Sequence, residues 1–311
     1  MPRRVDGIRV IVAALAVIAA CAGCGLGPGA GTSGVSLRVT QAFGTRQVRT
    51  VTAAHVAGSE TVMRMLQRSF RVATRYGGGF VQSIGGRSAS GDHSDWFYYV
   101  NGVQAKQGAA TTAVNQGDSI WWDLHDWQAT NSVPAVVGAY PEPFEHGLGG
   151  KRYPTTLECA PDVAAACKQV TTALNAAHVP VASQLLGTGS GPDTLGLVVG
   201  TWTELKGEVA AELIDHGPSA SGVYARFTGP DASSLALLNP AGRVAKTLGS
   251  GSGLIAATAD SSSVPTWLIT GTDPAGVAAA ARALTPQALH DHFALAVNGT
   301  SRLPVPLQAL P

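Results

Sequence analysis

The amino-acid sequence predicts an α+β protein with two folded domains behind an export leader. Charged residues make up only 13% of the chain, against ~25% in an average soluble protein, and 38 glycines and 18 prolines indicate many turns. From Val35 onward apolar residues alternate with a period of two, which is typical of strands. Beyond Pro134 short apolar runs alternate with helical patterns, which predicts a sheet with helices packed against it.

The charge of the chain is nearly balanced, with 21 lysines and arginines against 20 aspartates and glutamates. A balanced chain has no net field to attract nucleic acid or an anionic membrane surface. Nucleic acid is therefore not among the partners that we expect.

The first twenty residues, 1–20, have the pattern of a signal peptide. Arg3, Arg4 and Arg9 give a positive start, and residues 10–20 form an uninterrupted apolar run. This run is too short to span a bilayer, which needs about 20 apolar residues, but it suits the core of a signal peptide.

The end of the leader resembles the lipobox of bacterial lipoproteins, in which small residues precede a cysteine that receives lipid. Cys21 has the aliphatic Ile18 three places before it, whereas Cys24 has an Ala-Gly-Cys ending but a cysteine at the aliphatic position. We expect lipidation at Cys21, with Cys24 as the alternative, and ordinary cleavage with secretion as the other outcome. Residues 21–34 are then the lipid anchor and a flexible Gly/Pro tether.

Residues 35–130 are predicted to form a domain of strands around one helix. The helix is expected over residues 61–70, with Ser59 as its N-cap. Asn101-Gly102 predicts a tight hairpin, because both residues tolerate positive φ. The strands are expected over residues 35–39, 47–56, 80–84, 96–100, 103–106 and 119–127.

Several stretches of this domain match the motifs of a known domain family, and they occur in the same order along the chain. These stretches are Thr61–Leu66, Phe80–Ile84, Trp96–Gly102, Gly108–Ala109 and Gln116–Trp122. Through them residues 35–127 resemble the transcobalamin-like C-terminal domain family, whose bacterial lipoprotein members are largely of unknown function. The resemblance implies a β-grasp-like sheet packed on one helix. In the vitamin-carrier relatives this domain closes over a corrinoid held mainly by a helical barrel, and this sequence shows no such barrel.

The aromatic residues of this domain are candidates for a ligand site. Trp121 and Trp122 must point to opposite faces of a strand, so one can fill the core while the other faces solvent or a ligand. We predict a platform that binds an apolar or planar ligand, and the other interpretation is that these rings complete a small core. The platform residues are Trp96, Tyr98, Trp122, His125 and Trp127.

Residues 134–311 are predicted to form an α+β sandwich of unknown function rather than a doubly wound fold. Asp273 is expected to cap a helix that has Pro274 at its first position. Ala241-Gly242 predicts a hairpin turn between strands at 235–238 and 254–259. The other expected strands are 134–139, 195–202, 223–227 and 266–273, and the expected helices are 161–178, 208–214, 274–284 and 286–297.

Cys159 and Cys167 would lie in an oxidising compartment, where a disulfide is plausible. On one straight helix their Cα atoms would be about 12 Å apart, beyond the ~7 Å limit for a disulfide. Pro161 offers a helix start that lets Cys159 fold back towards Cys167. A disulfide and a pair of buried thiols both remain open.

No set of residues commits the chain to a reaction. The glycine-rich segments 187–191 and 249–253 lack the G-x-G-x-x-G spacing and a Walker lysine, so we interpret them as loops. Glu142, Glu145 and His146 lie in a Pro/Gly loop and could bind metal or polarise a substrate, although such triplets are common in solvated loops. We therefore expect no catalytic residues and no metal.

The combined prediction is a non-catalytic lipoprotein, anchored by lipid to the extracytoplasmic face of the cell membrane. Its expected role is small-molecule binding linked to uptake, with a transporter as a further partner. No bound cofactor is expected; a corrinoid or another planar, apolar molecule is the candidate ligand. The alternative is a structural or protein-docking lipoprotein of the cell envelope without a small ligand.

Overall fold

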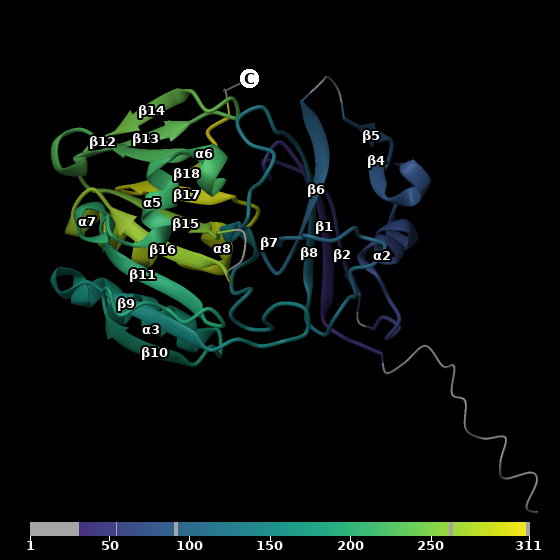
Figure 1. The fold of residues 1–311 in the computed structure, drawn as a ribbon, viewed down its shortest axis with the longest axis horizontal. Helices are drawn as coiled ribbons and strands as arrows, with labels where there is room; N and C mark the ends of the chain where they lie inside the picture. The colour runs from purple at the N-terminus through teal and green to yellow at the C-terminus, as the bar shows by residue number, and fades with distance from the viewer. Residues whose placement is uncertain (1–30, 54, 90–92, 261–263, 309–311) are drawn as a thin grey trace, which may run out of the picture.

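The computed structural model describes residues 31–53, 55–89, 93–260 and 264–308 (Figure 1). The predicted signal peptide and the two candidate lipidation residues, Cys21 and Cys24, lie outside these residues. The fold is α+β, as predicted. Within the described ranges, no helix has the length and apolar character needed to cross a membrane.

A five-stranded mixed sheet forms the first half of the molecule. Its strands are β1 (Val35–Gln41), β2 (Arg46–Ala53), β6 (Ser94–Val100), β7 (Val103–Gln104) and β8 (Ser119–Asp126). They lie in the order β2-β1-β8-β6-β7, in which β1 and β8 run parallel and the other neighbours antiparallel. Asn101 and Gly102, with φ of 53° and 76°, join β6 to β7, which confirms the predicted hairpin.

One helix and a small antiparallel sheet cover one face of the five-stranded sheet, at the right of Figure 1. These elements are α2 (Val62–Ser69), β3 (Val72–Arg75), the short 3-10 helix η2 (Tyr76–Gly78), β4 (Phe80–Ile84) and β5 (Arg87–Ser88). The N-cap of α2 is Thr61, whose side chain accepts a hydrogen bond from the Arg64 amide. The prediction of Ser59 as the cap is wrong, because Thr61 is the extended residue directly before the first helical turn.

The side chains of the five-stranded sheet alternate between two buried faces, as the strand period requires. Trp122 and Tyr98 lie in the cluster on the α2 side. Trp121 and Tyr99 lie in a second cluster, which they share with the other half of the molecule. Both tryptophans of the Trp121-Trp122 pair are therefore buried, at 0% and 2% exposure.

Seven strands form a mixed sheet in the second half of the molecule. They are β9 (Thr155–Cys159), β10 (Val181–Leu185), β11 (Leu195–Thr201), β15 (Ser252–Thr258), β16 (Thr266–Gly271), β17 (Ala294–Asn298) and β18 (Ser301–Val305). Their order is β10-β9-β11-β16-β15-β17-β18. The first four strands in this order run parallel to one another, and the three remaining neighbouring pairs are antiparallel.

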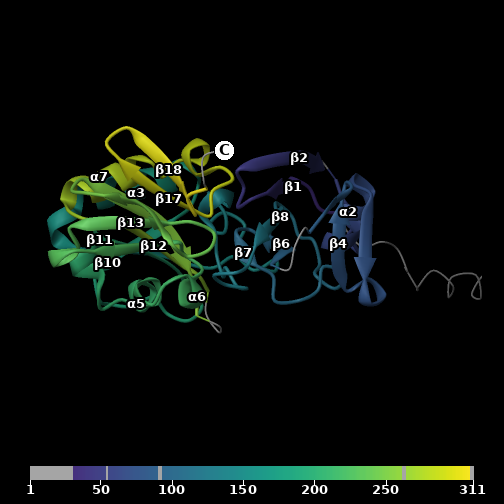
Figure 2. The same ribbon diagram turned by 90° about the horizontal axis from the view of Figure 1, so that it is seen from above.

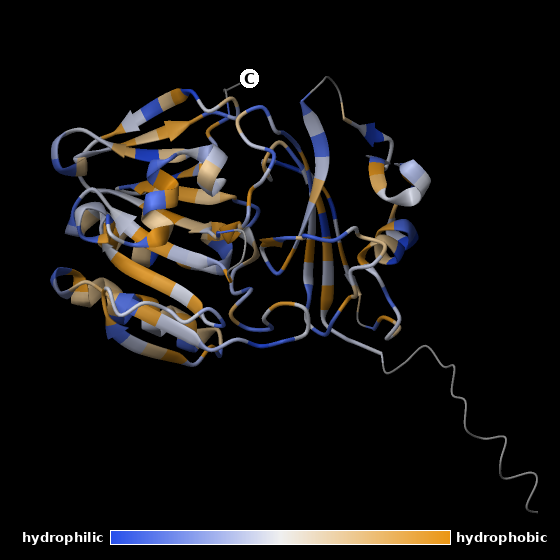
Figure 3. Cartoon of the chain, in the orientation of Figure 1, coloured by the Kyte–Doolittle hydropathy of each residue, from blue (hydrophilic) through white to orange (hydrophobic). Residues whose placement is uncertain are grey.

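Both faces of the seven-stranded sheet are covered, and Figure 2 shows α7 and α5 on opposite sides of it. One face packs on η4 (Pro161–Val163), α3 (Ala164–Ala176), α7 (Pro274–Arg282) and α8 (Pro286–Leu289). The other face packs under α4 (Trp202–Leu205), α5 (Val209–Asp215), α6 (Pro218–Ser221), η5 (Pro230–Ala232) and the antiparallel sheet β12 (Ala225–Thr228), β13 (Ser234–Leu238) and β14 (Val244–Leu248). Hydrophobic residues are concentrated in the central strands (Figure 3).

Three predicted elements of the second half are wrong. Residues 134–139 contain one bridge at Ala135 and the 3-10 helix η3 (Val137–Ala139) instead of a strand. The helix expected over 286–297 ends at Leu289 and is followed by β17, because an apolar run fits a buried strand as well as a helix. The Ala241-Gly242 turn joins β13 to β14 and not to the strand expected at 254–259. The sequence did not predict β14, because most of its residues are exposed.

The two halves meet in one buried aromatic cluster. The ring of Phe293 lies 5.1 Å from that of Phe43, 5.3 Å from that of Trp121 and 5.6 Å from that of Tyr99. Such offset and edge-to-face pairs add to the stabilisation that the burial of their apolar area provides. The interface is therefore part of the core of the protein.

A buried ion pair crosses the same interface. The Nη1 atom of Arg38, on β1, lies 2.7 Å from Oδ1 of Asp291, and its Nη2 atom donates to the Gly138 carbonyl at 3.1 Å. Gly44, with φ of 81°, approaches so closely that a Cβ atom there would lie 1.8 Å from the Asp291 carbonyl oxygen. Only glycine fits this contact.

The disulfide between Cys159 and Cys167 is confirmed. Cys159 ends β9 and Cys167 lies on α3, with their Cα atoms 6.1 Å apart. The turn of η4 between them brings the two within disulfide range, as the position of Pro161 indicated.

Candidate functional site

An aromatic pocket of about 250 Å³ lies between the five-stranded sheet and the elements that cover it. The sheet contributes Trp96, Tyr98 and Trp122, whereas β4 and α2 contribute Phe80, Val81 and Met63. The rings of Tyr98 and Trp122 stack with centroids 4.7 Å apart. One wall of the pocket is therefore a flat aromatic surface, which suits a planar or apolar molecule.

The polar groups of these three side chains differ in how they are satisfied. The Tyr98 hydroxyl lies 2.6 Å from the Gln107 carbonyl oxygen and 2.8 Å from Thr112 Oγ1. Trp96 Nε1 donates to the Arg87 carbonyl at 3.3 Å. Trp122 Nε1 is buried and has no hydrogen-bond partner within the described residues. A buried N–H without an acceptor is costly, so this donor sets Trp122 apart from Tyr98 and Trp96, whose polar atoms are paired.

The structure brings together three of the five predicted platform residues. Trp96, Tyr98 and Trp122 line the pocket, but His125 lies on the opposite face of β8. Trp127 follows β8, and its Nε1 atom donates to Asp95 Oδ2 at 3.0 Å. The single flat platform of five residues is therefore wrong, because alternation along β8 sends Trp122 and His125 to different sides.

His125 belongs to a buried polar network that the sequence did not reveal. Its ring stacks on Phe97 with centroids 4.4 Å apart, and its Nδ1 atom lies 2.9 Å from Asp123 Oδ1. The fully buried Asp123 carboxylate also accepts hydrogen bonds from the Thr40 hydroxyl and from the amides of Phe43 and Gly44. With every oxygen satisfied, the network orders the β1–β2 turn against the second half of the protein.

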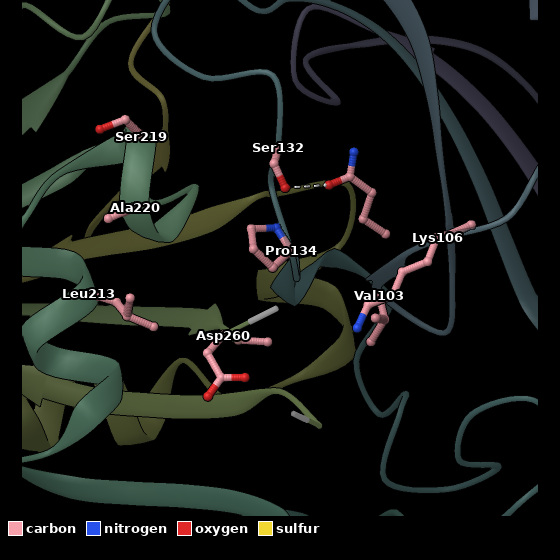
Figure 4. A pocket seen from close by; sticks show the side chains of 11 residues that line it. Val103, Lys106, Ser132, Pro134, Leu213, Ser219, Ala220 and Asp260 are labelled. Carbon is pink, nitrogen blue, oxygen red and sulfur yellow. Dashed lines mark hydrogen bonds between the residues drawn. The ribbon is translucent and has the colours of Figure 1, made fainter. Parts of the chain in front are cut away.

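Two larger grooves flank the edge strand β7. Each has a volume of about 610 Å³, and both are lined by residues 103–106. The first groove lies between the two halves, with Lys106 on one side and Leu213 and Asp260 on the other (Figure 4). The second groove runs towards Asn115 and Tyr153 and shares Gln104, Ala105 and Gln107 with the aromatic pocket. All three cavities therefore meet at β7.

The Gln104 side chain fixes the wall between the grooves. Its Oε1 atom accepts a hydrogen bond from Ser132 Oγ at 3.1 Å (dashed line in Figure 4). The same atom accepts a second hydrogen bond from the Val133 amide at 3.0 Å. These bonds tie the edge of the five-stranded sheet to the segment that leads into the second half. The sequence does not reveal this junction, because the pattern of residues 103–106 predicts only a short strand.

Glu142, Glu145 and His146 come together, with one potential ligand atom from each within 4.8 Å of the others. Glu142 is buried; its carboxylate accepts a hydrogen bond from the His146 amide at 3.0 Å and contacts His146 Nδ1. Burial raises the pKa of Glu142, and the hydrogen bonds from His146 oppose that rise. Carboxylate and imidazole donors of this kind could hold a divalent cation. In the structure Glu142 and His146 bond to each other instead.

The comparisons with known proteins cover part of the chain. Residues 59–126, from the approach to α2 to the end of β8, match a domain of unknown function, DUF4430. No curated protein matches the chain. A solved structure of a "putative metal binding protein" from Ruminococcus gnavus ATCC 29149 is similar at 15% identity and a TM-score of 0.25, over 30% of this chain and 97% of that one.

Proposed function

We propose that the protein is a non-catalytic, extracytoplasmic lipoprotein that binds a small planar or apolar molecule and presents it for uptake. The observation that carries this proposal is the aromatic pocket, in which three predicted ligand residues meet and Trp122 Nε1 lacks an acceptor. The resemblance of residues 35–127 to the transcobalamin-like family supports the same class of function.

The size of the pocket limits what it can hold. Its volume of about 250 Å³ is below the ~300–1,000 Å³ of sites for drug-sized ligands. A single fused ring system fits this space. A corrinoid is far larger, and most of it would have to lie in the two grooves beside β7, each of about 610 Å³.

The anchor completes the proposal. Lipid on Cys21 would hold the protein at the extracytoplasmic face of the membrane, where a transporter partner could receive the ligand. Intact-mass analysis of the mature protein tests this step and should give a chain that begins at a lipid-modified Cys21. A chain that begins at Cys24 would move the anchor, whereas an intact leader on a protein inside the cell would refute export.

Ligand binding is tested first by native mass spectrometry of protein purified from its own host, which should show a retained small molecule. Binding of the planar probe anilinonaphthalene sulfonate should then be measured with a Trp122→Phe variant. Phenylalanine keeps an aromatic ring and removes the donor, whose hydrogen bond is worth about 0.5–1.5 kcal/mol, or roughly a 2- to 12-fold change in affinity.

Trp267→Phe is the matched control, because it makes the same substitution at a buried tryptophan whose Nε1 also lacks a partner among the described residues, in the second half and away from the pocket. Its affinity for the probe should equal that of the natural protein. Equal losses in both variants would show that the probe binds elsewhere. No retained molecule, together with no binding of the probe or of a corrinoid, would leave a docking lipoprotein as the better explanation.

A further inference from the structure

The balanced charge of the whole chain conceals a strongly basic segment. Residues 49–88 contain six arginines, no lysine and one acidic residue, Glu60. Glu60 is 2% exposed, whereas all six arginines are exposed. The outer surface of this segment is therefore positive. The arginines are Arg49, Arg64, Arg68, Arg71, Arg75 and Arg87.

These arginines lie on the elements farthest from the second half of the protein. Arg64 and Arg68 are on α2, and the others, apart from Arg49, are on or beside β3 and β5. Figure 1 places α2, β4 and β5 at the outer edge of the molecule. Arg49 joins them, because its Nη1 atom donates to the Ser69 carbonyl at 3.5 Å at the end of α2. We call this set the basic face.

Little of this charge is neutralised within the protein. In the described part of the chain, only Arg68 of the six pairs with an acidic side chain, that of Glu60. By contrast, residues 131–311 contain nine basic and thirteen acidic residues. The molecule is therefore polarised, with an excess of positive charge at one end.

An aromatic pair projects beside the basic face. Tyr76 is 85% exposed and Phe80 37% exposed, with ring centroids 6.4 Å apart. Arg75 is the register partner of Phe80 in the β3–β4 pair, so cationic and aromatic groups are interleaved. Exposed aromatic rings next to cations are typical of surfaces that meet the interfacial region of a bilayer.

We propose that the basic face binds the anionic headgroups of the membrane that carries the protein. The proposal rests on the lipid anchor of the proposed function. From Cys21 to Thr32 the tether can span at most about 40 Å, at ~3.6 Å per residue, which keeps the domain close to the lipid surface. A polybasic surface adds an electrostatic attraction to the attachment that the acyl chains provide. It would also orient the protein, with the second half pointing away from the bilayer.

Vesicle flotation tests the proposal independently of the anchor. The protein from residue 25 onward, which contains every described helix and strand, should float with vesicles of phosphatidylglycerol and phosphatidylcholine but not with phosphatidylcholine alone. Raising the salt from about 0.1 M to about 1 M shortens the Debye length from ~10 Å to ~3 Å and should release it. Binding to neutral vesicles that salt does not affect would overturn the proposal.

The decisive variant is Arg71→Gln/Arg75→Gln/Arg87→Gln. It should bind anionic vesicles roughly 100-fold more weakly, from about 1 kcal/mol for each arginine. The control changes three exposed arginines of the second half: Arg226→Gln/Arg243→Gln/Arg302→Gln. Both variants should melt like the natural protein. Equal losses in the two variants, or tighter binding to a soluble anionic polysaccharide than to anionic vesicles, would refute a lipid-binding face.

The outcome separates the two proposals. Vesicle binding by the unanchored protein supports the basic face whether or not Cys21 carries lipid. Lipidation without any vesicle binding would support the anchor and reject the basic face.

Discussion

Replacing Asp291 by asparagine should destabilise the interface between the two halves of the protein. The substitution leaves the Arg38 guanidinium, whose side chain is 6% exposed, without its buried counter-ion. Removal of one partner of a buried ion pair costs about 3–5 kcal/mol. Asparagine keeps an oxygen that can accept from Nη1, and it tolerates the positive φ of 61° at position 291. We therefore expect a loss of about 3 kcal/mol, at the lower end of that range.

The loss can be measured by urea unfolding followed through both tryptophan fluorescence and circular dichroism. Trp121 is a suitable reporter, because it lies fully buried at the interface and the Arg38 guanidinium is 4.8 Å from its ring centroid. If the interface opens before the sheets unfold, the fluorescence transition will precede the loss of secondary structure. The unfolding would then not be two-state, and the fluorescence transition alone would report on the interface.

A double-mutant cycle with Arg38→Met separates the free-energy cost of the unpaired guanidinium from the cost of lost packing. The double variant should lose less stability than the sum of the two single variants, because it leaves no unpaired guanidinium. Strict additivity, or a loss below about 1 kcal/mol in Asp291→Asn, would show that water reaches the pair and that the buried geometry does not govern its energy.

Two other features lead to predictions about stability. Cys159→Ala/Cys167→Ala should lower the free energy of unfolding by about 2.5 kcal/mol, from the entropy of the short loop that the disulfide closes, as measured against the oxidised natural protein. Burial raises the pKa of Glu142 above its ordinary value of 4.5, so ionisation of this carboxyl costs more in the folded than in the unfolded state. The protein should therefore lose stability as the pH rises from 4.5 through the raised pKa of the folded state. Glu142→Gln should lack this loss when urea unfolding is compared between pH about 4 and about 6, and parallel pH profiles would contradict the assignment.

The features that follow from local chemistry could be predicted from the sequence. Asn101-Gly102 gives its hairpin because both residues adopt positive φ. Asp273 caps α7 by accepting from the Gly276 amide, with Pro274 following it. The opposite directions of Trp121 and Trp122 also follow from the strand period alone.

The missed features depend on contacts between distant residues. The buried environment of His125 comes from Phe43 and Phe293, and the partner of Arg38 lies 253 residues along the chain. β9 and β10 contain several polar residues, so hydropathy did not identify them as strands. Composition gave a balanced charge because it averages the basic face with the acidic second half.

The position of Phe80 connects the pocket with the basic face. Its ring is one wall of the aromatic pocket and also pairs with Tyr76 at the exposed edge. A ligand that enters the pocket beside Phe80 would therefore come from the side of the basic face, which we propose to lie against the lipid surface. Phe80→Ala should weaken both the binding of anilinonaphthalene sulfonate and the flotation with anionic vesicles, because a side chain that is 37% exposed serves both contacts.

Tyr76 distinguishes this arrangement from two unrelated sites. Its side chain is 85% exposed and does not line the aromatic pocket. Tyr76→Ala should therefore reduce vesicle binding by several-fold, the effect of roughly 1 kcal/mol of interfacial aromatic contact, and leave the affinity for the probe unchanged. If Phe80→Ala changes only one of the two affinities, or if Tyr76→Ala weakens the probe equally, the pocket does not open at the membrane-facing edge.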